Sequence, residues 1–250
     1  MNDDYIHPLD HALSSKILQS TFGNLLMEAV FNNHLDEVNS YLYSTSCYLL
    51  DENSDAYQYM LEGCQLFNVQ IYPKLYINRS YSYQVICTGM NQPIICVPDV
   101  LIKRGDQDIL RGRIMAAVAS IKAGHHKLTF FTWVYDNFSS LLPIPFLDTA
   151  IRTAKNEWYR AQFYTLDRAF YLATNNVKLT LKNILYGETS FEMLDKFSFE
   201  NKDSFSKQVD EFRSLDEATD LIALLKSYFE EESWLPERYY LIQQYVKGGD

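Results

Sequence analysis

A change of pattern between residues 74 and 98 constrains the fold more than any other feature. Three short segments there are rich in Tyr, Ile, Val and Cys, a composition typical of β-strands: Lys74–Asn78, Tyr83–Thr88 and Pro93–Pro98. A Gly-Met-Asn-Gln stretch at residues 89–92 separates the last two and indicates a turn. Pro93 and Pro98 predict that the third strand lies at an edge, because proline cannot donate to a strand ladder.

The rest of the chain has the apolar spacing of helices. Before the strands, helices are predicted at Asp10–Ser20, Gly23–Phe31, Leu35–Ser44 and Asp55–Phe67. After them, one helical period starts near Asp106 and continues to Leu128, and further helices are predicted at Thr149–Ala173, Ser204–Phe212 and Leu215–Glu231. We therefore predict an α+β fold, in which one mostly helical domain over residues 1–250 contains a small sheet.

The charge of the chain restricts its partners. The formal net charge is -10 and no basic block occurs, so neither nucleic acid nor anionic lipid is an expected partner. The acidic start, Met1–Asp4, is unlike a signal peptide. The most apolar interval, Thr129–Leu147, contains Asp136 and two prolines, so no transmembrane segment is predicted. These features favour a cytoplasmic protein.

The cysteines give no metal motif, because none are spaced as Cys-x-x-Cys. For a cytoplasmic protein we expect four reduced thiols: Cys47, Cys64, Cys87 and Cys96.

Four short motifs, taken in order, carry a resemblance to a known family. They are His-Pro-Leu-Asp at 7–10, Ile-Lys-Ala-Gly-His at 121–125, Trp-Tyr-Arg-Ala at 158–161 and Thr-Leu-Asp-Arg-Ala at 165–169. With the strand segments Pro73–Ile77 and Gln92–Leu101, they resemble the HtpX and CAAX prenyl-endopeptidase type of zinc metallopeptidase in its soluble form, which has a gluzincin fold. The resemblance implies a helix bearing His-Glu-x-x-His and a later helix bearing a third ligand, Glu. Two His four residues apart share a helix face and bind zinc, and the adjacent Glu is the general base.

The chain departs from that family at every position that would carry chemistry. Counted from Gly124-His125, the first His corresponds to Ala116, the general base to Ala117 and the second His to Ser120. Counted from Asp167, the third ligand corresponds to Phe163. None of these side chains can replace what the motif requires, so we expect no metal, no cofactor and no peptidase activity. We also expect Phe163 to fill the space that zinc and its ligands would leave.

Other polar residues of the motifs are predicted to be structural. In the family the residue matching His125 is not a ligand, and Asp167 and Arg168 belong to the supporting shell. A structural role is therefore expected for all three, with a hydrogen bond or ion pair for Asp167 and Arg168. His7 and His11 have ligand spacing, but Pro8 places His7 before the helix begins.

Two stretches are predicted to bind a peptide or partner. Related enzymes hold extended substrate against a sheet edge, and pairing with an edge needs only backbone groups and side-chain pockets. This assigns Ile94, Ile95, Cys96 and Val97 to peptide binding. The aromatic interval from Phe130 to Phe146 is expected to cover the former cleft or to dock a partner through Trp133, Tyr135 and Phe138.

These observations favour a catalytically inactive zinc-peptidase homologue that binds a peptide or protein and acts as a regulatory subunit. The expected partner is an intact homologous zinc peptidase, and the expected process is peptide maturation. Two alternatives remain open at this point. One is an enzyme whose chemistry has moved to other residues, and the other is a small-molecule or lipid-binding module that uses the former cleft.

Overall fold

A computed structural model describes residues 3–19, 43–79, 84–104, 106–138, 145–188 and 235–248, together with Lys207. The predicted helices Gly23–Phe31 and Leu215–Glu231 lie outside the described residues, as do nearly all of Leu35–Ser44 and Ser204–Phe212. The side chains at 104, 138, 145–151 and 186–188 are not described.

The sheet has four described strands, in the order β1-β2-β4-β3. They are β1 (Tyr48–Leu49), β2 (Lys74–Asn78), β3 (Ile86–Thr88) and β4 (Ile94–Pro98). β2 and β4 run parallel, whereas β1 and β3 are antiparallel to their neighbours. The α+β prediction is confirmed, and the predicted and observed bounds of β2 agree.

The prediction that Pro93–Pro98 forms an edge strand is wrong. β4 lies inside the sheet, with Ile94 opposite Lys74 on one side and Thr88 on the other, and all its residues are buried. Pro93 precedes the strand and Pro98 ends it, so neither removes a donor from its middle. The described edges of the sheet are instead β1 and β3.

The helices account for most of the described chain. They are α1 (Pro8–Leu18), α4 (Asp55–Phe67), α5 (Asp99–Arg104), α6 (Gln107–Lys122), α7 (His125–Phe138), α8 (Pro145–Thr174), α9 (Val177–Glu188) and α13 (Leu235–Val246). The predicted period through Leu128 crosses a real break, because α6 ends at Lys122 and α7 starts at His125. Gly124, with φ of +79°, makes this break, in a conformation that glycine adopts readily.

Local capping fixes where α4 and α6 begin. The Ser54 side chain accepts a hydrogen bond from the backbone N–H of Tyr57, and Asp106 accepts one from Ile109. Ser and Asp are preferred N-caps because they satisfy an otherwise unpaired helical N–H. α4 ends where Asn68 takes the left-handed conformation, at φ of 54°.

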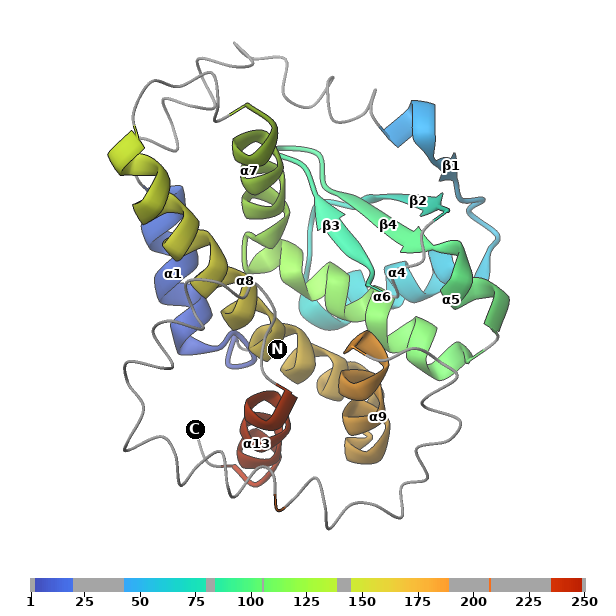
Figure 1. Ribbon diagram of the computed structural model, residues 1–250. Coiled ribbons are helices and arrows are strands. Elements are labelled where there is room, and N and C mark those ends of the chain that lie inside the picture. The colour runs from blue at the N-terminus through green and yellow to red at the C-terminus, as the bar shows by residue number, and fades with distance from the viewer. Residues whose placement is uncertain are drawn as a thin grey trace.

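The two faces of the sheet have different coverings. Leu75, Ile95 and Val97 belong to the main core, which α4 and α6 share (Figure 1). Tyr76, Ile94 and Cys96 form a smaller cluster on the other face, covered by Tyr43 and Cys47. One face is thus held by two long helices, and the other by a short segment before β1.

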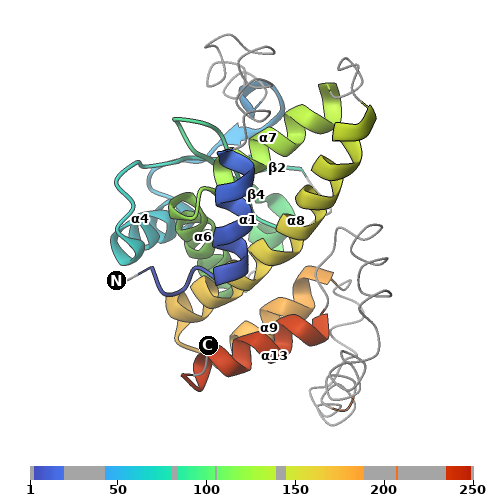
Figure 2. The same ribbon diagram turned by 90° about the vertical axis from the view of Figure 1, so that its left-hand side faces the viewer.

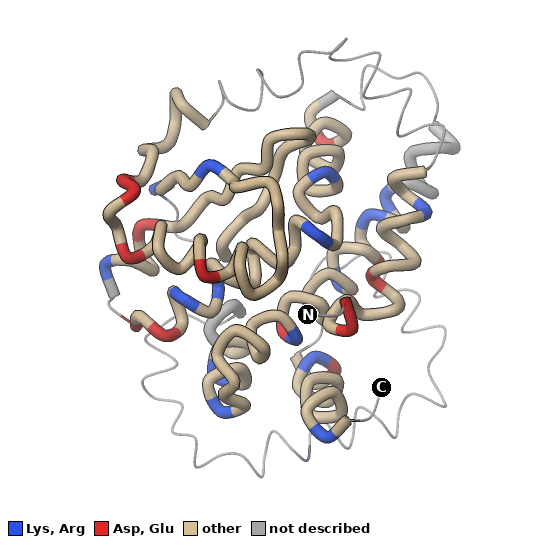
Figure 3. Tube along the Cα trace, turned by 180° about the vertical axis from the view of Figure 1, so that it is seen from behind, with Lys and Arg blue, Asp and Glu red and all other residues tan. Residues whose placement is uncertain are grey.

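The long helix α8 joins the remaining elements. It contacts the helices α1, α6, α9 and α13. α9 and α13 lie side by side (Figure 2). Acidic and basic positions are interspersed along the elements drawn in Figure 3. Across the described residues, every helix is too short or too polar to cross a membrane.

Candidate functional site

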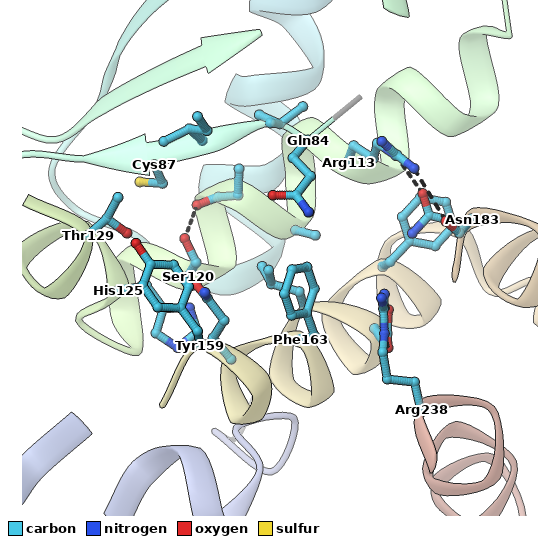
Figure 4. A pocket seen from close by; sticks show the side chains of 18 residues that line it. Gln84, Cys87, Arg113, Ser120, His125, Thr129, Tyr159, Phe163, Asn183 and Arg238 are labelled. Atoms are coloured by element: carbon cyan, nitrogen blue, oxygen red, sulfur yellow. Dashed lines mark hydrogen bonds and ion pairs between the residues drawn. The ribbon is translucent and has the colours of Figure 1, made fainter. Parts of the chain in front are cut away.

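A cavity of about 270 Å³ lies where α6, α7, α8 and β3 meet (Figure 4). α6 and α8 supply most of its wall, and residues 84–87, in and just before β3, line another side. α9 and α13 each contribute one polar residue, Asn183 and Arg238. The cavity therefore collects side chains from distant parts of the chain.

The four positions that correspond to the zinc-peptidase motif all line this cavity. Ala116, Ala117 and Ser120 face it from α6, and Phe163 faces it from α8. The Ser120 hydroxyl donates to the carbonyl of Ala117 at 2.7 Å, the helix's own backbone. The positions are brought together in space, but their side chains supply neither a metal-binding group nor a base.

The expectation that Phe163 fills the space is not met, because the cavity remains open. Phe163 is only half-buried, and the guanidinium carbon of Arg238 lies 4.6 Å from the centre of its ring. A guanidinium over a ring face is attracted by the negative face of the ring. Phe163 therefore forms part of the cavity wall, where it contacts a cation, and leaves room beside it.

Close packing of α6 on α8 sets the inner end of the cavity. A Cβ atom added at Gly112 would meet the ring of Phe170 at 2.4 Å, which is shorter than carbon atoms tolerate. Phe170 is buried and also lines the cavity. The absence of a side chain at Gly112 is thus what allows this ring to lie across α6.

A buried polar cluster lies behind the cavity and connects the first and second resembling motifs. Asp10 accepts hydrogen bonds from Ser14 and Thr165, and its carboxylate lies 2.7 Å from Nε2 of His125. Burial pushes the pKa of Asp10 upward, but the His125 ring and these hydrogen bonds outweigh it and lower that pKa overall. Because Asp10 stays ionised, it holds the imidazole of His125 in one orientation.

A second buried pair lies at the opposite end of the cavity. Both nitrogen–oxygen distances between Arg238 and the Asp167 carboxylate are 2.8 Å, a bidentate pair. Burial raises the pKa of Asp167, and Arg238 opposes that rise. Arg168, the neighbour of Asp167, lies 4.6 Å from the ring centre of Tyr245 on α13. Asp167 and Arg168 thus tie α8 to the C-terminal helix.

Arg113 is the second guanidinium in the lining. It donates from Nε to the Asn183 side-chain oxygen at 2.6 Å and from Nη2 to the Asn183 carbonyl at 3.3 Å. Sequence reasoning missed both Asn183 and Arg238, since their partners lie about seventy residues away along the chain. The sequence carries no local signal for either pairing.

The nucleophile nearest the cavity is poorly suited to catalysis. Cys87 lines the cavity, and burial raises the pKa of its thiol to about 12, although a hydrogen bond with Ser120 opposes that rise. Nucleophilic attack needs the thiolate, so a thiol of this pKa is inert near neutral pH. The geometry gives no support to relocated cysteine chemistry.

The predicted binding residues have different outcomes. Ile94, Ile95, Cys96 and Val97 are buried in the interior strand, where both backbone edges are paired. Trp133 is partly exposed and lines a second pocket, of about 610 Å³, between α7, β3 and the segment before β1. Tyr135 is buried, and the side chain of Phe138 is not described.

The two pockets adjoin. Ile86, Thr129 and Tyr159 border both of them, so the two pockets lie next to each other beside β3. Within the described part of the chain, β3 pairs with β4 alone. The edge strand beside α6 is therefore β3, whereas the sequence led us to expect β4 in that place.

The described residues hold no cluster of three or more His, Cys, Asp or Glu side chains that could bind a metal ion. Comparison with protein-family models, with curated proteins and with solved structures finds no match to this chain.

Proposed function

We propose that this chain is a catalytically inactive relative of the zinc peptidases that acts as a peptide-binding or regulatory subunit. Its ligand occupies the cavity between α6, α8 and β3. One observation carries the proposal: Ala116, Ala117, Ser120 and Phe163 line a single open cavity while offering no ligand or base. A cavity kept open costs packing energy, and bound ligand offsets that cost.

An extended peptide is the ligand that suits the cavity wall best. Gln84, Val85, Ile86 and Cys87 line it along the outer side of β3. The edge strand of a sheet can accept a further strand through backbone hydrogen bonds, and adjoining pockets accept alternate side chains. The cavity and the second pocket, which both have Ile86 in their lining, provide two such places.

The partner in this proposal is an intact homologous zinc peptidase in peptide maturation. This chain holds the peptide, and the partner supplies the zinc and the general base. Mixing the two proteins should accelerate cleavage of a peptide that this chain binds, whereas this chain alone leaves the peptide intact.

The proposal is tested with peptides selected from a displayed library against the full chain. In Ala116→Phe a ring enters the cavity, and Lys103→Phe places the same ring on the exposed surface of α5 as a matched control. Ala116→Phe should weaken binding at least about tenfold, while Lys103→Phe leaves it unchanged. Equal binding by both folded variants would refute the cavity as the site. If Ala116→Phe does not fold, the smaller change Ala116→Val takes its place in the binding measurement.

A small apolar molecule is the second candidate ligand. Much of the lining is apolar, including Ala116, Ala117, Leu166 and Phe170, which is typical of small-molecule sites. Displacement of an apolar fluorescent dye by a medium-chain fatty acid, combined with failure to select any peptide, would favour this candidate. Loss of dye binding in Ala116→Phe would place the dye in the same cavity.

A further inference from the structure

Two thiols that are far apart in sequence meet on the second face of the sheet. The Sγ atoms of Cys47 and Cys96 lie 3.8 Å apart, although the residues are 49 positions apart in the chain. Cys47 immediately precedes β1, and Cys96 lies in the middle of β4. A disulfide bond is about 2.0 Å long, so the sulfur atoms must approach each other by roughly 1.8 Å. Rotation of the half-buried Cys47 side chain can supply much of that movement.

The surroundings make one of the two sulfur atoms accessible. Cys96 is only 1% exposed, in the cluster with Tyr76 and Ile94, and Cys47 packs against that cluster from outside. Cys47 also lines the second pocket, so a reagent that enters this pocket reaches Cys47 first. The other thiols, Cys64 and Cys87, are buried in the main core.

We propose that Cys47 and Cys96 form a reversible disulfide that fastens the segment before β1 onto the sheet. The bond would tie residues 43–49 to the central strand and fix one wall of the second pocket. This inference does not depend on the proposed binding function, because it rests on the contact between two thiols outside the motif positions, although the pocket that Cys47 lines is one of the two places proposed for peptide side chains.

The oxidant is a small disulfide such as oxidised glutathione, and the reaction is two successive exchanges. The Cys47 thiolate attacks one glutathione sulfur, the glutathione S–S bond breaks, and one glutathione thiolate leaves. The Cys96 thiolate then attacks the Cys47 sulfur and releases the second glutathione. The two protein thiols lose two electrons and two protons, and one glutathione disulfide becomes two glutathione thiols.

The order of attack follows from burial. Desolvation raises the pKa of Cys96, and the neighbouring Cys47 raises it further, so Cys96 is a poor first nucleophile. Its reaction with the mixed disulfide on Cys47 is fast only because the two sulfur atoms are already adjacent.

The test equilibrates the reduced full-length chain with excess oxidised glutathione and counts free thiols. The count should fall from four to two, and peptide mapping should find Cys47 joined to Cys96. Oxidation should raise the Tm by roughly 5–10 °C, because the bond closes a long loop. Cys64→Ala and Cys87→Ala are the matched controls and should lose the same two thiols.

Variants of the pair decide the outcome. Cys96→Ala should stop at a mixed glutathione disulfide on Cys47, and Cys47→Ser should keep all its remaining thiols and show no rise in Tm. Cys47 is half-buried, so Cys47→Ser should fold even if Cys96→Ala, which changes a buried residue, does not. Cys47→Ser alone then tests the proposal. Four free thiols in the wild type at equilibrium, an accumulating mixed disulfide, or a cross-link through Cys64 or Cys87 would each overturn the proposal.

Discussion

The four motif positions in the cavity wall and the buried polar layer beside them differ sharply. At the wall, Ala116, Ala117 and Phe163 carry no titratable group, and the Ser120 hydroxyl bonds to its own helix. Beside them, Asp10 pairs with His125 and Asp167 pairs with Arg238, all four buried, and His125, Asp167 and Arg238 line the same cavity. Polar groups that join helices are thus present around the cavity, whereas the four positions assigned to the motif offer neither a metal ligand nor a base.

That difference separates scaffold from chemistry. Buried charges are costly unless paired, so each pair also fixes the relative positions of the elements it joins. His125 and Asp10 join α7 to α1, and Asp167 and Arg238 join α8 to α13. The two pairs thus position the helices that surround the cavity.

The largest expected effect comes from breaking the Asp167–Arg238 pair. Asp167→Ala leaves the buried guanidinium of Arg238 without its carboxylate, and should lower the free energy of unfolding by about 3–5 kcal/mol. Urea unfolding of the variant and the wild type measures this loss of stability. The exposed Lys103–Asp99 pair is the control, and Lys103→Ala should cost no more than about 1 kcal/mol. Equal small losses in both variants would show that the polar layer does not hold the scaffold.

Restoring the motif should be the next most costly change. The combined variant Ala116→His, Ala117→Glu, Ser120→His and Phe163→Glu puts polar groups against a largely apolar wall. In chelator it should lose about 2–4 kcal/mol, because each buried and unpaired polar group is costly. Thermal unfolding with and without zinc measures the loss, and we expect no peptidase activity in either condition. A variant that is as stable as the parent in chelator would mean that the wall already tolerates polar groups.

The Asp10 cluster should give a smaller effect that depends on pH. The pKa of Asp10 is lowered from 3.8 on folding, so its ionised form stabilises the folded state. That contribution is fully present above the ordinary pKa and is lost as the pH falls through the folded pKa. Asp10→Asn should therefore cost about 1–2 kcal/mol at neutral pH and show a shallower loss of stability in acid than the wild type. Parallel acid unfolding curves for the two proteins would contradict this account.

Gly112→Ala should have the smallest effect on stability and a clear effect on the cavity. The added methyl group must displace the Phe170 ring, a cost that the higher helix propensity of Ala partly offsets, leaving a net loss of about 1 kcal/mol. Phe170 lines the cavity, so displacement of its ring should change the cavity wall and weaken peptide binding. Adding Phe170→Leu should restore stability to the Gly112→Ala variant. No change in either property would show that α6 and α8 separate easily.

The sequence predicts local elements well and their assembly less well. The bounds of α4 and β2 agree with prediction, because a Ser N-cap marks one and a β-prone run forms the other. The place of β4 in the sheet was not predictable from its prolines, since prolines at strand ends are also compatible with an interior strand. α9 and α13 were missed, and with them Arg238.

The candidate site shows the same limit. The resemblance assigned Ala116, Ala117, Ser120 and Phe163 to one site, and all four line one cavity. Helical periodicity accounts only for the grouping of Ala116, Ala117 and Ser120 on one side of α6. Whether Phe163 fills that space depends on its contact with Arg238, from a helix 75 positions further along the chain. Such long-range contacts leave no periodic trace in the sequence.

The most direct test of the central claim is calorimetric titration of a selected peptide into the full chain, with and without a zinc chelator, followed by mass spectrometry of the peptide. A metal-free binding cavity predicts the same affinity in both conditions and a peptide of unchanged length. Binding that disappears in chelator, or a peptide recovered in fragments, would contradict the account and show that the chain has a metal site or catalytic group that acts on its ligand.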